Sequence, residues 1–117
     1  MADELKTASV ETMNYPVVGV TFENRQDILN DFYKNYKSGG RYGVKLVEET
    51  DNAYDPNAVA VHLETSPGTY QHVGYISRND NALAKERMPR LESARLRSIG
   101  PNRKGQIGLT IDVAYNK

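Results

Sequence analysis

The last part of the chain alternates strictly between apolar residues and small or polar ones. The apolar positions are Ile107, Leu109, Ile111, Val113 and Tyr115. Because successive side chains of a β-strand point to opposite faces, this period predicts a strand with one apolar and one mostly polar face. Such a strand buries its apolar face only within a larger sheet, so the rest of the chain is expected to supply further strands.

Five other segments have the composition or the alternation of strands. They span residues 15–22, 44–49, 58–63, 72–77 and 94–98. Ser66-Pro67-Gly68 predicts a hairpin turn between the third and fourth of these segments. In the fifth, Leu, Glu and Arg individually favour helix, but the alternation favours a strand.

Two segments have helical spacing. Asn24 is expected to cap the first helix, with Asp27 three positions later, and Gly39-Gly40 to end it. Its apolar face carries Ile28, Leu29, Phe32, Tyr33 and Tyr36. Asn79 is expected to cap a second, shorter helix, which Pro89 limits; its inward residues are Ala82, Leu83 and Met88. Six strands and two helices predict a mainly β fold, either a small, highly curved sheet or a barrel.

The length and composition predict one domain. The chain has 117 residues and a mass of 13.1 kDa. Residues 1–13 are expected to form a flexible N-terminal arm and residues 14–117 the domain. The absence of cysteine excludes disulfides, thiol nucleophiles and Cys-type metal sites. Since no apolar run reaches the roughly 18 residues of a membrane helix, and the first residues do not resemble a signal peptide, we expect a soluble cytoplasmic protein with no membrane partner.

The two signs of charge are equal in number but separated along the chain. Lys+Arg and Asp+Glu are both 15, which excludes a uniformly basic protein that coats a duplex. Residues 1–60 carry a net charge of −4 and residues 61–117 a net charge of +4. Residues 78–104 hold eight basic and three acidic side chains. This segment is either a local anion-binding face or an ordinary solvated surface, and charge alone favours the second.

Metal sites are not expected. His62 and His72 are the only histidines, and they lie on two strands joined by a hairpin, so they are candidate cross-strand neighbours. Two ligands without a suitably spaced carboxylate do not make a closed zinc site. The acidic loop at 51–57 is similar to a calcium loop, but Pro56 stands where glycine is required and His62 where the bidentate glutamate is required.

Catalysis is not expected either, and no cofactor is implied. The chain has no Gly-x-Ser-x-Gly, no Walker-type phosphate loop, and no dinucleotide-binding fingerprint, because the glycines at 39, 40 and 43 follow a helix. A hydrolase of an unrecognised type stays open as an alternative. Asp55-Pro56-Asn57 is a combination of residues that favours a turn. The aromatic beside it, Tyr54, is either a lid packed on the barrel or a ligand contact.

Several stretches in chain order resemble a HIRAN domain, in the stand-alone form found in bacteria and phages. They span residues 17–22, 44–47, 51–61 and 73–78. The combination of Asn52, the Tyr54-Asp55 pair, Asn57-Ala58 and the later Val73-Gly74-Tyr75-Ile76 is specific to this family. The resemblance is strong over residues 17–88 and weaker to residue 115.

The resemblance implies an OB-like six-stranded antiparallel barrel that binds the 3′ end of single-stranded DNA. Phe22 and Tyr54 match the positions whose rings sandwich terminal bases, and Asp55 the position that accepts a hydrogen bond from the 3′-hydroxyl. A 3′-phosphate there would meet a like charge. Asn52 is implied to shape the pocket, and the backbone-contacting positions are Tyr75 and Arg78.

One departure from the family concerns phosphate attraction. The family often has a basic residue just before the first stacking aromatic, where this chain has Thr21. Arg25, at the start of the expected first helix, is a candidate replacement, because helix-start amides and a guanidinium together bind anions.

The resemblance also implies a role in DNA repair or replication, with a DNA-processing partner such as a SWI/SNF-type helicase. The alternative is a protein-interaction module that has lost DNA binding. Its contact surface would be the tyrosine-rich first helix, and the chain would then form a homo-oligomer.

Overall fold

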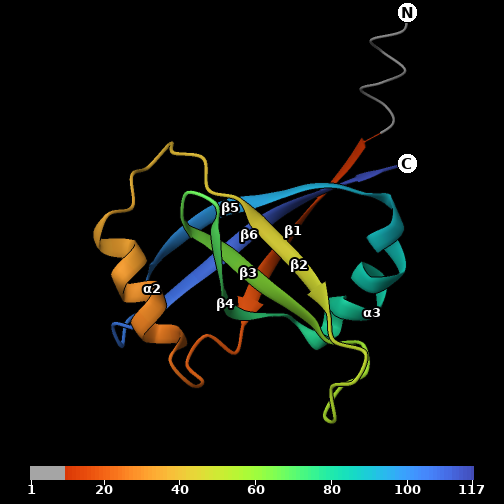
Figure 1. The fold of residues 1–117 in the computed structure, drawn as a ribbon, viewed down its shortest axis with the longest axis horizontal. Coiled ribbons are helices and arrows are strands. Elements are labelled where there is room, and N and C mark those ends of the chain that lie inside the picture. The colour runs from red at the N-terminus through yellow and green to blue at the C-terminus, as the bar shows by residue number, and fades with distance from the viewer. Residues whose placement is uncertain (1–9) are drawn as a thin grey trace, which may run out of the picture.

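A computed structural model describes residues 10–117 as six antiparallel strands in one sheet, with two α-helices (Figure 1). The elements in chain order are β1 (Val10–Val18), α2 (Arg25–Lys34), β2 (Val44–Glu48), β3 (Val59–Ser66), β4 (Thr69–Ile76), α3 (Arg78–Arg87), the short 3₁₀ helix η1 (Met88–Arg90), β5 (Leu91–Pro101) and β6 (Ile107–Asn116). The strand order across the sheet is β2-β3-β4-β1-β6-β5. The mainly β architecture predicted from the sequence is confirmed.

The sheet curves strongly because β1 joins its two halves. The first part of β1, residues 10–16, pairs with β6, and its last residues, Val17 and Val18, pair with β4. A Cβ on Gly74 would lie 2.5 Å from the Val18 carbonyl oxygen, so only glycine allows this approach. Next to the outermost strands, Gly43, just before β2, forms an isolated bridge with Arg95 of β5. The sheet is therefore OB-like but not closed into a complete barrel.

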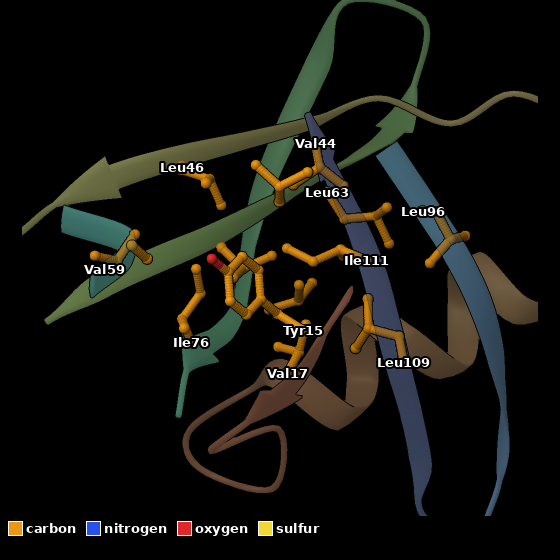
Figure 2. Packing of buried hydrophobic residues seen from close by; sticks show 14 of the residues in the cluster. Tyr15, Val17, Val44, Leu46, Val59, Leu63, Ile76, Leu96, Leu109 and Ile111 are labelled. Carbon is orange, nitrogen blue, oxygen red and sulfur yellow. The ribbon is translucent and has the colours of Figure 1, made fainter. Parts of the chain in front are cut away.

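The core lies on the concave side of the sheet. Figure 2 shows Tyr15, Leu63, Ile76 and Ile111 pointing toward one another from four strands. The alternation in β6 is confirmed, because all five of its apolar positions are buried. The hydroxyls of Tyr15 and Tyr115 lie 3.1 Å apart within this core, and burial raises the pKa of Tyr115 well above its ordinary value.

The first strand differs from the expectation at both ends. The expected arm at 1–13 is wrong for residues 10–13, which belong to β1 and pair with residues 113–116 of β6; residues 1–9 lie outside the described part of the chain. A long partner strand recruits this segment although it has no strong strand signal of its own. The strand ends at Val18, because Gly19 has a φ of 71° and turns the chain out of the sheet.

The first helix is shorter than predicted and starts differently. It begins after Asn24, but that side chain makes no capping hydrogen bond, and it ends at Lys34 rather than at the glycine pair. Leu29 and Phe32 are buried as expected. Tyr36 packs against the Tyr42 ring, with the centroids 5.4 Å apart. Part of the tyrosine-rich face therefore serves internal packing.

The second helix turns a different face inward. Its cap is Ser77, whose Oγ accepts a hydrogen bond from the Asn79 N–H, so the helix starts two residues before the expected place. Leu83 is 45% exposed, and Ala82 is exposed as well, which contradicts their predicted burial. The buried residues are Asn81 and Ala84. No helix in the part of the chain that the structure describes is long and apolar enough to span a membrane.

The predicted proximity of the two histidines is confirmed. His62 and His72 are cross-strand partners, and their rings stack with centroids 5.1 Å apart. Burial lowers the pKa of both imidazoles below the ordinary value of 6.5. The His72 ring lowers the pKa of His62 further, and the Arg25 charge does the same to His72. Protonation of either ring is therefore unfavourable in the folded chain.

The histidine pair predicts a loss of stability on mild acidification. In the unfolded chain both imidazoles titrate normally, so below neutral pH the unfolded state binds more protons than the folded state and the free energy of unfolding falls. Urea denaturation between about pH 7.5 and about pH 5.5 measures this, with His62→Gln as the variant. We expect a smaller decrease for the variant; equal slopes for both proteins would contradict the assignment.

Candidate functional site

Three segments meet at one end of the sheet and enclose a pocket of about 750 Å³. They are the 19–24 loop, the 49–58 loop and the start of α3; both loops project from the lower edge of the molecule in Figure 1. The lining residues are Val18, Gly19, Phe22, Glu23, Arg25, Asn52, Tyr54, Asp55, Ala58, Tyr75, Ile76, Arg78 and Asn81. A pocket of this size is typical of small-ligand sites.

All seven residues singled out from the sequence line this one pocket. They are Phe22, Arg25, Asn52, Tyr54, Asp55, Tyr75 and Arg78. The sheet explains the convergence, because Val17 pairs with Ile76 and so brings the end of β1 beside the end of β4. Their proximity is a finding, whereas their contacts with a ligand stay a prediction.

Two aromatic rings stand exposed on the pocket from separate loops. Phe22 is 66% exposed and Tyr54 is 89% exposed. An aromatic ring buries much of its surface when it stabilises a fold, and Tyr54 buries almost none of its own. The alternative that Tyr54 packs as a lid on the barrel is therefore wrong, and both rings are free to stack on a ligand.

Asp55 is held within the pocket as a carboxylate. Its Oδ1 accepts a hydrogen bond from the Asn57 N–H at 2.9 Å, and its Oδ2 accepts one from Asn81 Nδ2 at 2.7 Å. Arg78 Nε lies 3.6 Å from Oδ2. The Asn57 and Asn81 hydrogen bonds, followed by the charges of Arg78 and Lys85, keep the pKa of Asp55 below its ordinary value.

The 49–58 loop owes its shape to Asn52. Asn52 Oδ1 accepts hydrogen bonds from the backbone N–H groups of Tyr54 (2.9 Å) and Asp55 (3.0 Å). This arrangement is an Asx turn. Its Nδ2 donates to Glu49 Oε1, which also accepts from the Tyr75 hydroxyl at 2.9 Å. Glu49 therefore ties the loop to β4, a role that its place at the end of the expected 44–49 strand did not reveal.

Arg25 is more enclosed than an anion-binding residue would be. Its side chain is only 7% exposed; it donates to the Gly19 carbonyl at 2.7 Å and to Glu23 Oε1 at 2.6 Å. Its guanidinium also lies over the Tyr75 ring, 5.2 Å from the centroid. These hydrogen bonds let Arg25 hold the 19–24 loop in place. Because its guanidinium is already paired with Glu23, a phosphate would have to displace that carboxylate.

Arg78 is the accessible cation of the pocket. Its side chain is 74% exposed, and its Nη2 donates to the Tyr54 carbonyl at 2.8 Å. Of the eight basic residues at 78–104, Arg78 alone is among the lining residues, so this segment does not form one continuous anion-binding face at the pocket. Arg97, for example, pairs with Asp112 on the neighbouring strand at 3.4 Å.

Two further lining residues, Glu23 and Asn81, have no recognisable signal in the sequence. Asn81 is 3% exposed and contacts Asp55, while Glu23 balances Arg25. With Glu23, the lining holds two carboxylates and two guanidinium groups, so it is neutral overall. Within residues 10–117, no group of three or more His, Asp or Glu side chains is arranged to hold a metal ion.

Comparison with known proteins identifies the family. The sequence model of the HIRAN domain matches residues 10–111, and its start coincides with the start of β1. No curated protein and no solved structure gives a significant match. The HIRAN domain is known as a nucleic-acid-binding domain rather than a catalytic one. Because the match covers nearly all of the 117 residues, the chain belongs to the HIRAN domain family.

Proposed function

We propose that the chain captures single-stranded DNA at its 3′-hydroxyl end in this pocket. The observation that carries the proposal is the arrangement of Phe22, Tyr54 and Asp55: two exposed rings from separate loops stand beside one fixed carboxylate. Rings of this kind stack on bases whatever their sequence. The carboxylate reads the chemistry of the end rather than the bases.

Recognition of the end follows from the properties of a carboxylate. An ionised carboxylate accepts hydrogen bonds and donates none, so Asp55 suits a hydroxyl. A strand that ends in a phosphate would place a second anion beside Asp55, at a cost that disfavours it. A strand that continues through the pocket has no free 3′-hydroxyl to donate to Asp55, and its next phosphate would place an anion beside that carboxylate.

The cations of the pocket hold the sugar–phosphate backbone only weakly. Arg78 is exposed and offers donors to one phosphate, while Arg25 is neutralised by Glu23. The number of phosphates that a protein neutralises sets the salt dependence of binding. We therefore expect stacking, rather than ion pairing, to supply most of the affinity.

A fluorescence titration with two otherwise identical oligonucleotides tests the proposal. The strand with a 3′-hydroxyl is expected to bind more tightly than the strand with a 3′-phosphate. The logarithm of its affinity is expected to fall with the logarithm of salt concentration with a slope of about −0.7, since Arg78 is the one exposed cation among the described residues that line the pocket. Equal binding of both strands would contradict end capture, and a steep slope would indicate a broad electrostatic surface instead.

The proposed biological setting is DNA repair or replication. A module that holds an end without acting on it requires a DNA-processing partner, and a SWI/SNF-type helicase is the kind that the family resemblance implies. The oligomerisation alternative has less support, since Phe32 of α2 and Tyr36, just after that helix, pack against Tyr42. Light scattering in high salt distinguishes the two, because the alternative requires a salt-resistant dimer that does not bind DNA.

A further inference from the structure

A buried amide lies behind the carboxylate of the pocket. Asn81 is on the first turn of α3, is 3% exposed, and donates from Nδ2 to Asp55 Oδ2 at 2.7 Å. Burial of an amide is costly unless it is hydrogen-bonded. Among the described residues, Asp55 is the partner of this side chain. A polar residue at this core-facing position is therefore explained by its contact with the pocket.

The carboxylate of Asp55 accepts hydrogen bonds from two different structural elements. The Asn57 N–H holds Oδ1 from within the 49–58 loop, and Asn81 holds Oδ2 from α3. The last torsion of an aspartate side chain is otherwise broad. Two donors from separate elements fix the plane of the group, so binding does not have to order it.

The same contacts leave the carboxylate able to accept more. Two oxygens offer about four lone-pair sites, and the two hydrogen bonds use two of them. Arg78 Nε, at 3.6 Å, adds charge but is too far for a good hydrogen bond. We infer that Asn81 is the specificity-determining positioning residue of the pocket, which holds the Asp55 carboxylate oriented to accept a ligand hydroxyl. This inference rests on the proposed function.

The effect of Asn81 on the pKa of Asp55 can be measured separately from the effects of the charged groups around Asp55. Arg78 and Lys85 act on Asp55 from α3, and Glu23 and Arg25 line the same pocket from the 19–24 loop and α2. Replacing Asn81 leaves all four charges in place. The Asn81 hydrogen bond is the second-largest influence that lowers the pKa of Asp55, after the Asn57 N–H, so its loss raises that pKa.

The first experiment is an NMR titration of the Asp55 carboxyl carbon in the free protein. In Asn81→Ala the midpoint is expected to move to higher pH. In Asn79→Ala, a matched control exposed on the same helical turn, it is expected to stay unchanged. An unchanged midpoint in folded Asn81→Ala would overturn the inference. If alanine prevents folding, Asn81→Asp keeps the shape, and its added negative charge is expected to raise the Asp55 midpoint further.

The second experiment measures how the same variants bind two oligothymidylates that differ only in ending in a 3′-hydroxyl or a 3′-phosphate. Thymine has no group that protonates in the acidic range, so the bases add nothing to the pH profile. The 3′-phosphate itself titrates at about pH 6, equally for the wild type and the variants, so the effect of Asn81 is the difference between their profiles. Asn81→Ala is expected to reduce the preference for the 3′-hydroxyl end about fivefold and to raise the pH at which that preference is lost. Equal weakening of both strands, with an unchanged pH profile, would show a merely structural role. A wild-type protein without end preference would defeat the proposed function, whereas the titration would still decide the role of Asn81.

Discussion

Replacing Tyr54 by alanine is expected to weaken the binding of single-stranded DNA about 5- to 150-fold. Removal of one stacking ring costs about 1–3 kcal/mol per base. The ring is 89% exposed, so its loss should leave the free energy of unfolding almost unchanged. The affinity for both oligonucleotides should fall, because a base stacks in the same way whether its strand ends in a hydroxyl or a phosphate. Fluorescence anisotropy with the two oligonucleotides measures the change.

Two variants separate stacking from other effects of the substitution at Tyr54. Tyr54→Phe keeps the ring and should bind nearly as well as the wild type. Tyr33→Ala removes a tyrosine that is 37% exposed and lies outside the pocket, so it should bind normally. Wild-type affinity in Tyr54→Ala, or an equal loss in Tyr33→Ala, would remove the basis for stacking in this pocket.

Replacing Asp55 by asparagine is expected to abolish the preference for the 3′-hydroxyl end. The change keeps the shape of the side chain but removes its charge and half of its acceptor capacity. Affinity for the 3′-hydroxyl strand should fall about tenfold or more, as expected for a hydrogen bond to a charged group. Affinity for the 3′-phosphate strand should rise, because the repelling anion is gone. The two strands should then bind alike.

Asp51→Asn is the matched control for charge in the same loop. Asp51 is exposed and outside the lining of the pocket, so its neutralisation should leave the end preference intact. Thermal unfolding of both variants checks that the loop survives, since Asp55 also holds the Asn57 N–H. A preserved end preference in folded Asp55→Asn would mean that another group reads the terminus.

The strands were predictable from sequence because their signal is local. The alternation in β6 and the Ser66-Pro67-Gly68 turn depend on residues that are close neighbours in the chain. Pairing partners are not encoded locally, which is why residues 10–13 could not be recognised as part of β1. In the second helix, the inward face depends on contact with the 49–58 loop, so Leu83 was wrongly expected to be buried.

In the candidate site, too, some residues could be recognised from the local sequence and others could not. Asn52, Tyr54 and Asp55 lie in one short segment whose pattern is specific to the family, so they could be found in the sequence. Asn81 acts through Asp55, which the fold brings to it from 26 residues away. Glu23 acts through Arg25, two residues along the chain, in a pairing that no motif marks. Their residue types are ordinary for a loop and for the first turn of a helix, so no local pattern distinguishes them.

The pairing of β1 with β6 has a consequence for how such a domain is joined to other proteins. Val10 pairs with Asn116, so the two ends of the described fold lie side by side. The nine residues of β1 carry the chain from there to Val18 at the pocket, a span of about 27 Å. Two adjacent ends far from the pocket allow such a domain to be inserted as a unit into a surface loop of a larger protein, with the mouth of the pocket facing outward.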